Sequence, residues 1–126
     1  MGKTGFRELK VWQRAKDLAI YIYQISNCGS FSRDFGLRDQ IRRAAVSAPS
    51  NIAEGDERDT NKDAVRFLYI AKGSLAEVIT QTIIAHEIGY LNETERNYIE
   101  QECESLGKML GSLIKARSPH IITNNL

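Results

Sequence analysis

The chain has 126 residues, of which 42% are hydrophobic and 26% are charged, a balance typical of one soluble globular domain. Its 17 basic and 16 acidic residues give a formal net charge of +1, which argues against a protein dominated by binding to polyanions. No stretch approaches the ~20 apolar residues of a membrane span, and residues 1–8 lack the apolar core of a signal peptide. We therefore expect a cytoplasmic protein without a membrane partner.

The first predicted helix covers residues 8–27. Its apolar residues are spaced four and three apart, as on a helix that packs against other helices: Val11, Ala15, Leu18, Ile22 and Ile25. Cys28-Gly29-Ser30 ends this helix, because glycine readily adopts the left-handed conformation that follows helix ends.

The second predicted helix covers residues 34–55. Pro49 lies inside it and is expected to kink it, because proline lacks a backbone donor and clashes with the preceding turn.

The third predicted helix covers residues 62–89 with Asn61 as its N-cap, and the fourth covers residues 92–117 with Asn92 as its N-cap. The inward positions of the fourth helix are Ile99, Cys103, Leu106, Leu110 and Leu113. No segment shows the alternating pattern of a strand. The sequence thus predicts an all-α fold, an antiparallel up-down-up-down four-helix bundle over residues 1–118, with a loose C-terminal tail at 119–126.

The third helix is apolar around most of its circumference, more than an isolated four-helix bundle can cover. A surplus apolar flank of this kind favours a closed homo-oligomer. The alternative is that this helix is simply the most central one.

Basic residues gather in the first half of the chain, where residues 1–53 contain nine Lys or Arg and four Asp or Glu. Arg38 and Arg42 are four residues apart and share a helix face, while Arg43 points about 100° away. Guanidinium groups offer paired donors to phosphate oxygens, so this face is a candidate for binding RNA or DNA, aided by Lys10, Arg14 and Arg58. Alternatively, these arginines pair with carboxylates within or between subunits: Asp39, Glu54, Glu77 and the acidic run 93–104. No run of basic residues interleaved with aromatic ones is present to stack bases.

A patch of short polar residues surrounds the proline of the second helix: Ser47, Pro49, Ser50, Asn51 and Glu54. Short hydroxyl and amide side chains can satisfy the backbone groups that a kink releases, which is a structural role. The functional alternative is a polar pocket beside the kink that takes a small molecule.

The sequence contains no catalytic, cofactor or metal motif that we can identify. His86 and His120 occur in no Glu-x-x-His pattern, and His86-Glu87 lacks the second ligand of the zinc-protease motif because Tyr90 occupies its place. The two cysteines, Cys28 and Cys103, make neither a disulfide framework nor a four-ligand metal site. We expect a protein with no catalytic residues, no cofactor and no metal.

Four segments carry a resemblance to a known family: Leu9–Ala15, Gln40–Gly55, Phe67–Glu77 and Ile88–Leu91. The chain resembles the bacterial four-helix-bundle proteins first noticed as products of intervening sequences in large-subunit ribosomal RNA genes. The resemblance implies a homopentamer, and a relative is the accessory protein of diversity-generating retroelements, which works with a reverse transcriptase and binds nucleic acid. This chain has Ile79-Thr80-Gln81-Thr82 where the family usually has Glu-Thr-Gln-Leu, which removes a carboxylate. It also has Phe31-Ser32 where the family usually has Phe-Pro.

These observations lead to two hypotheses. The first is a non-enzymatic, oligomeric accessory or scaffold protein that binds RNA or DNA through the basic face of the second helix, with a reverse transcriptase or another protein as partner. The alternative is a protein–protein interaction module with no nucleic-acid role, in which the same arginines hold subunits or a partner protein.

Overall fold

The computed structural model describes residues 5–118, which form four α-helices and no strand. Helix α1 covers Lys10–Ile25, α2 Phe35–Asp56, α3 Asn61–Glu87 and α4 Glu93–Arg117. Two short 3-10 helices precede α1 and α2: η1 at Gly5–Glu8 and η2 at Gly29–Arg33. The fold is therefore all-α with four helices, as predicted. The predicted tail at 119–126 lies outside the described residues.

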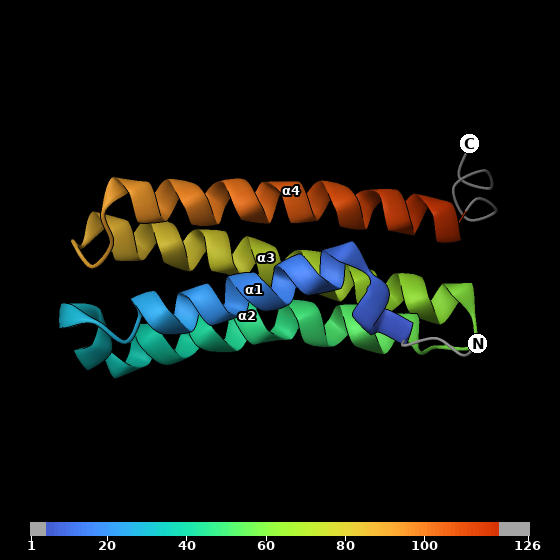
Figure 1. Ribbon diagram of the computed structural model, residues 1–126, viewed down its shortest axis with the longest axis horizontal. Helices are drawn as coiled ribbons and strands as arrows, with labels where there is room; N and C mark the ends of the chain where they lie inside the picture. Colours follow the sequence, from blue (N-terminus) through green and yellow to red (C-terminus); the bar gives the residue numbers. More distant parts are fainter. Residues whose placement is uncertain (1–4, 119–126) are drawn as a thin grey trace.

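The helices lie side by side along the long axis of the molecule (Figure 1). The connections α1–α2 and α3–α4 are at one end, and the α2–α3 connection is at the other (Figure 1). Helices α2 and α3 make the most extensive contact. Gly55 contributes to it, because a Cβ atom at this position would lie only 3.1 Å from the Ala64 carbonyl oxygen and 3.3 Å from the Phe67 Cβ. None of the helices within residues 5–118 is long and apolar enough to cross a membrane.

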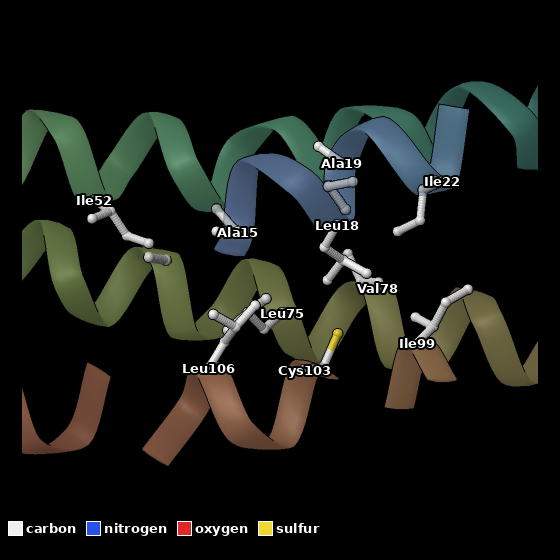
Figure 2. Packing of buried hydrophobic residues seen from close by; sticks show 14 of the residues in the cluster. Ala15, Leu18, Ala19, Ile22, Ile52, Leu75, Val78, Ile99, Cys103 and Leu106 are labelled. Atoms are coloured by element: carbon white, nitrogen blue, oxygen red, sulfur yellow. The ribbon is translucent and has the colours of Figure 1, made fainter. Parts of the chain in front are cut away.

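The core contains side chains from all four helices. Figure 2 shows Leu18 of α1, Ile52 of α2, Val78 of α3 and Leu106 of α4 within this cluster. The inward face of α4 continues from Leu110 to Ile114, which is buried, whereas Leu113 is half-buried. Leu113, predicted to face inward, packs against the core but is less buried than Ile114, because alternating steps of four and three drift away from the true 3.6-residue turn.

Helix α3 and its C-cap residue also carry apolar side chains that the other helices leave exposed: Tyr69, Ile70 and Ile84 on the helix, and Ile88 at the cap. Helix α3 packs against both α2 and α4, and these two contacts cover part of its surface. A central position thus accounts for part of the apolar circumference of α3. It does not account for the apolar side chains that remain exposed.

Polar side chains cap three of the helices. Asn92 forms a complete capping box with Glu95 at the start of α4, as its position predicted. The N-cap of α3 is Thr60, whose hydroxyl accepts from the Asp63 backbone N–H, so the assignment of Asn61 as N-cap was wrong by one residue. Helix α2 starts at Asp34, which accepts from the Leu37 backbone N–H at 3.1 Å.

Asp34 also joins the two connections that meet at its end of the bundle. The Tyr90 hydroxyl donates to the second Asp34 oxygen at 2.9 Å, and the Tyr90 ring stacks on the fully buried Phe31, with centroids 5.3 Å apart. The Leu37 N–H and the Tyr90 hydroxyl lower the pKa of Asp34 below its ordinary value.

We expect the stabilisation by Asp34 to depend on pH. Because the folded-state pKa is depressed, the contribution is complete above the ordinary carboxyl pKa of about 3.9 and is lost as pH falls through that value and the folded pKa. Asp34→Asn keeps a capping oxygen but removes the charge. In urea unfolding from pH 7 to 2.5, wild type should exceed Asp34→Asn in stability at pH 7, and the two should converge in acid. A difference that stays constant with pH would contradict this account.

Pro49 is buried within α2, and so is its neighbour Ala48. The kink expected at this position stays a prediction.

Candidate nucleic-acid interface

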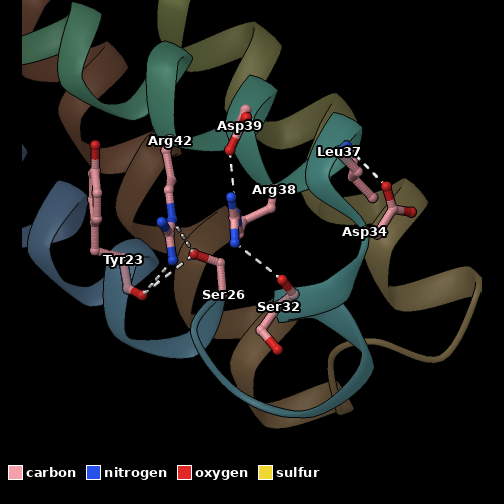
Figure 3. A network of polar contacts seen from close by, with 8 residues as sticks. All are labelled: Tyr23, Ser26, Ser32, Asp34, Leu37, Arg38, Asp39 and Arg42. Atoms are coloured by element: carbon pink, nitrogen blue, oxygen red, sulfur yellow. Dashed lines mark hydrogen bonds and ion pairs between the residues drawn. The ribbon is translucent and has the colours of Figure 1, made fainter.

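Arg38 is occupied by contacts close to it in the chain. Its Nε donates to the Asp39 carboxylate at 3.1 Å, and its Nη1 donates to the Ser32 carbonyl oxygen at 3.0 Å (Figure 3). Its guanidinium lies 4.7 Å from the centre of the Phe35 ring. Asp39 therefore compensates the charge of Arg38. The Arg38 side chain mainly fixes η2 against the start of α2.

Arg42 joins α2 to the end of α1 without a carboxylate partner. Its Nε donates to Oγ of the fully buried Ser26 at 2.8 Å, and its Nη2 donates to the Tyr23 carbonyl oxygen at 3.4 Å (Figure 3). The guanidinium also stacks over the Tyr23 ring, 4.6 Å from its centre. All these partners are neutral, and Arg42 forms no ion pair within residues 5–118.

Arg43 is exposed, and within residues 5–118 it has no hydrogen-bond or ion-pair partner. It nevertheless lines the same surface hollow as Arg42, although the helical spacing directs the two about 100° apart. We call this hollow of about 360 Å³ the arginine hollow; its lining residues are Tyr23, Asp39, Arg42, Arg43 and Val46. Residues 39, 42, 43 and 46 are one broad face of α2, and Tyr23 faces them from α1.

A second hollow of about 330 Å³ lies on the other side of Arg43, between α2 and α3. Its lining residues are Gln40, Arg43, Ala44, Ser47, Glu77 and Gln81. Glu77 is exposed and forms no ion pair with Arg43. Arg43 thus lines two hollows, and each contains one carboxylate: Asp39 beside Arg42 in the first and Glu77 in the second.

The remaining predicted basic residues lie elsewhere. Arg14 forms two 2.9 Å hydrogen bonds with the Glu102 carboxylate, which link α1 to α4, and a 3.0 Å bond to Ser105. The bonds to Glu102 raise the pKa of Arg14 above its ordinary value. Arg58 pairs with Glu54 and stacks on the Phe67 ring at 4.5 Å.

Lys10 is exposed at the start of α1, and it lines a hollow of about 200 Å³ between α1 and α4 with Leu9, Val11, Met109 and Leu113. Two of the six basic residues singled out in the sequence, Arg42 and Arg43, therefore line the same hollow.

One hydrogen bond between α2 and α3 and two within α2 join the residues of the polar patch near Pro49. The hydroxyls of Ser47 and Ser74 lie 2.7 Å apart, and the Asn51 amide donates to the Ser47 carbonyl oxygen and hydroxyl at 2.9 and 3.0 Å. Ser50 is exposed. Ser47 also lines the hollow between α2 and α3.

Tyr23 is the site residue that the sequence did not reveal. It is 19 residues from Arg42 in the chain, and only the packing of α1 on α2 brings the two together. A search for aromatic residues within basic runs cannot find such a pair. The tyrosine content of the first helix was the only signal available.

The described residues show no group of three or more His, Cys, Asp or Glu side chains that could hold a metal ion. Cys103 is buried in the core, and its burial there raises the pKa of its thiol to about 12, so it remains a neutral, unreactive thiol at neutral pH.

Comparison with known proteins places the chain in a family. It matches the family described as 23S rRNA-intervening sequence protein over residues 7–112. Among solved structures it is similar to a protein of unknown function from the S23 ribosomal protein family of Bacteroides thetaiotaomicron VPI-5482. The two share 22% sequence identity over 83% of this chain and 98% of that chain, and the TM-score of 0.76 shows a common fold. No curated protein matches the chain. The family match runs from before α1 into the last turns of α4, and the chain thus belongs to the 23S rRNA-intervening sequence protein family.

Proposed function

We propose that this protein is a non-enzymatic, oligomeric accessory protein that binds RNA or DNA at the arginine hollow. The observation that carries the proposal is that Arg42 and Arg43 line one hollow while neither forms an ion pair within residues 5–118. Two uncompensated guanidinium groups on one surface attract phosphates even when the net charge of the protein is close to zero.

The two arginines are suited to different parts of this task. Arg42 is fixed by Ser26 and the Tyr23 carbonyl, so its remaining N–H groups are already oriented before a ligand arrives. Arg43 is exposed and has no partner among residues 5–118, so it can reach along a strand to a second phosphate. Guanidinium groups bind phosphate through two parallel hydrogen bonds, which suits backbone contacts that carry no sequence preference.

Assembly is the second part of the proposal. The exposed apolar residues of α3 (Tyr69, Ile70 and Ile84), together with Ile88 at its C-cap, are a surface that a second copy of the chain would cover. The pentamer implied by the family resemblance would present several arginine hollows, and modest contacts at each would then add through avidity.

The same α3 surface also supports the alternative, a protein–protein interaction module with no nucleic-acid role. In that case Arg43 would pair across an interface with a carboxylate such as Glu77 of another copy. Its charge reversal would then lower the mass of the assembly and would affect no nucleic-acid binding.

The proposal predicts the effect of reversing a single charge. Arg43→Glu should weaken binding of a fluorescent single-stranded RNA and reduce the slope of log affinity against log salt by about 1, because one phosphate contact is lost. The matched control is Lys108→Glu, which makes the same change of charge at an exposed residue of α4 that has no partner within residues 5–118. Fluorescence anisotropy at roughly 25 to 200 mM salt measures the affinity and the salt slope of both variants. An equal effect of the two substitutions would show general charge attraction and would contradict the site.

A further inference from the structure

We infer that the arginine hollow selects single-stranded over double-stranded nucleic acid, because one unpaired base stacks on the ring of Tyr23. This inference rests on the proposed function and adds the class of nucleic acid that the site takes. It concerns a residue of α1, whereas the phosphate contacts are made by α2.

The first reason is the way Tyr23 is held. The Arg42 guanidinium lies over the ring at 4.6 Å from its centre, and two hydrogen bonds fix that guanidinium to Ser26 and to the Tyr23 backbone. The ring is therefore positioned by a cation that two hydrogen bonds hold. Tyr23 is still 45% exposed, so a base would stack on the ring face opposite the Arg42 guanidinium. An oriented and exposed ring loses little conformational freedom on binding.

The second reason is the chemistry of the hollow around the ring. Val46 adds a second apolar side chain, 41% exposed, and Arg42 and Arg43 add two positive charges. The Asp39 carboxylate is the one acidic group of the lining, and it would repel a phosphate from its end of the hollow. An apolar surface next to two guanidinium groups suits a ligand with a flat ring joined to a phosphate.

The third reason is geometric. The hollow of about 360 Å³ is near the lower end of the range of small-ligand sites, about 300–1,000 Å³, which suits one nucleotide. The bases of a duplex already stack on one another, so their faces are not available to Tyr23 without unstacking. A flexible single strand can present one base to the ring while its phosphates reach the arginines.

The test compares Tyr23→Leu with Tyr23→Phe, which keeps an aromatic ring. Tyr23→Leu should weaken binding of a single-stranded RNA by about 5- to 150-fold, the range for loss of one base–aromatic stack, and should leave duplex binding within about twofold. Tyr23→Phe should bind both ligands like wild type. Anisotropy measures the affinities, and circular dichroism checks that each variant keeps its helices.

A second measurement uses only the wild-type protein and therefore does not depend on the folding of a variant. A strand of the same length without bases keeps every phosphate, and it should bind about as weakly as the normal strand binds to Tyr23→Leu. A strand that contains 2-aminopurine should lose fluorescence on binding to wild type, since stacking on an aromatic ring quenches this base.

The outcomes separate the inference from the proposed function. If Arg43→Glu weakens binding while the strand without bases binds as well as the normal strand, stacking is wrong and phosphate binding stands. Equal affinity of wild type for single strand and duplex would also overturn the inference. If no nucleic acid binds the wild type, both the inference and the proposed function are wrong.

Discussion

The double charge reversal Arg42→Glu/Arg43→Glu is expected to weaken nucleic-acid binding by at least about 100-fold at low salt. Hydrogen bonds to charged groups contribute about 1.5–3 kcal/mol each, so the loss of two phosphate contacts costs about 3–6 kcal/mol before any repulsion from the new carboxylates. A factor of ten corresponds to about 1.4 kcal/mol. Anisotropy with a labelled single-stranded RNA measures the change.

This variant needs controls for structure, because Arg42 also joins α2 to α1. Its replacement removes the donors to Ser26 Oγ and to the Tyr23 carbonyl oxygen, so helix content and thermal stability must be measured with the affinity. Lys72→Glu/Lys108→Glu applies the same total change of charge on α3 and α4, at exposed residues without partners among residues 5–118. This control should retain most of the affinity.

The double reversal also distinguishes the two candidate functions. The nucleic-acid hypothesis predicts that the variant keeps the assembly mass of wild type, measured by light scattering, and loses affinity for RNA. The interaction-module hypothesis predicts a smaller assembly and no affinity to lose. A folded double variant with wild-type affinity would contradict the assignment of the arginine hollow.

The largest expected effect on stability comes from Phe31→Ala. Phe31 is fully buried in η2 and stacks on Tyr90, so its truncation leaves a cavity between the two connections at that end of the bundle. Replacing a buried Phe by Ala typically costs about 3–5 kcal/mol in the free energy of unfolding. Because η2 carries the Ser32 carbonyl that holds Arg38, and Asp34 follows directly, the start of α2 should loosen as well.

Phe35→Ala is the matched control, four residues further along the chain. Phe35 is 64% exposed and contacts the Arg38 guanidinium, so we expect a loss below about 1 kcal/mol. Urea unfolding followed by circular dichroism measures both variants. Similar losses for the two variants would show that Phe31 does not anchor this end.

The fold could be predicted because its main signals are local. Apolar spacing locates each helix, and Asn92 with Glu95 marks the start of α4. An error arises where two adjacent residues are almost equally suited to the same position. Thr60 and Asn61 are adjacent polar residues that can both cap a helix, and only the backbone at Thr60, with φ of −117° and ψ of 151°, decides between them. Helix η2 was not predicted, because its one buried side chain, Phe31, is fixed by contacts with Tyr90 far along the chain.

The site could be predicted only in part, because ion pairing and hollows depend on three-dimensional neighbours. The sequence singles out Arg42 and Arg43, but it cannot show that Arg14 is occupied by Glu102, 88 residues away. Nor can it place Tyr23 beside Arg42. Side-chain length adds a further effect, since two neighbouring arginines that leave a helix in different directions still line one hollow.

The most direct test of the central claim is the affinity of wild type for a single-stranded RNA, a single-stranded DNA and a duplex, measured by anisotropy at low and near-physiological salt. We predict that the single strands bind at low salt, that the affinity falls steeply as salt rises, and that the duplex binds more weakly. Absence of binding to all three at low salt would contradict nucleic-acid binding and would leave the arginines as residues of a protein interface.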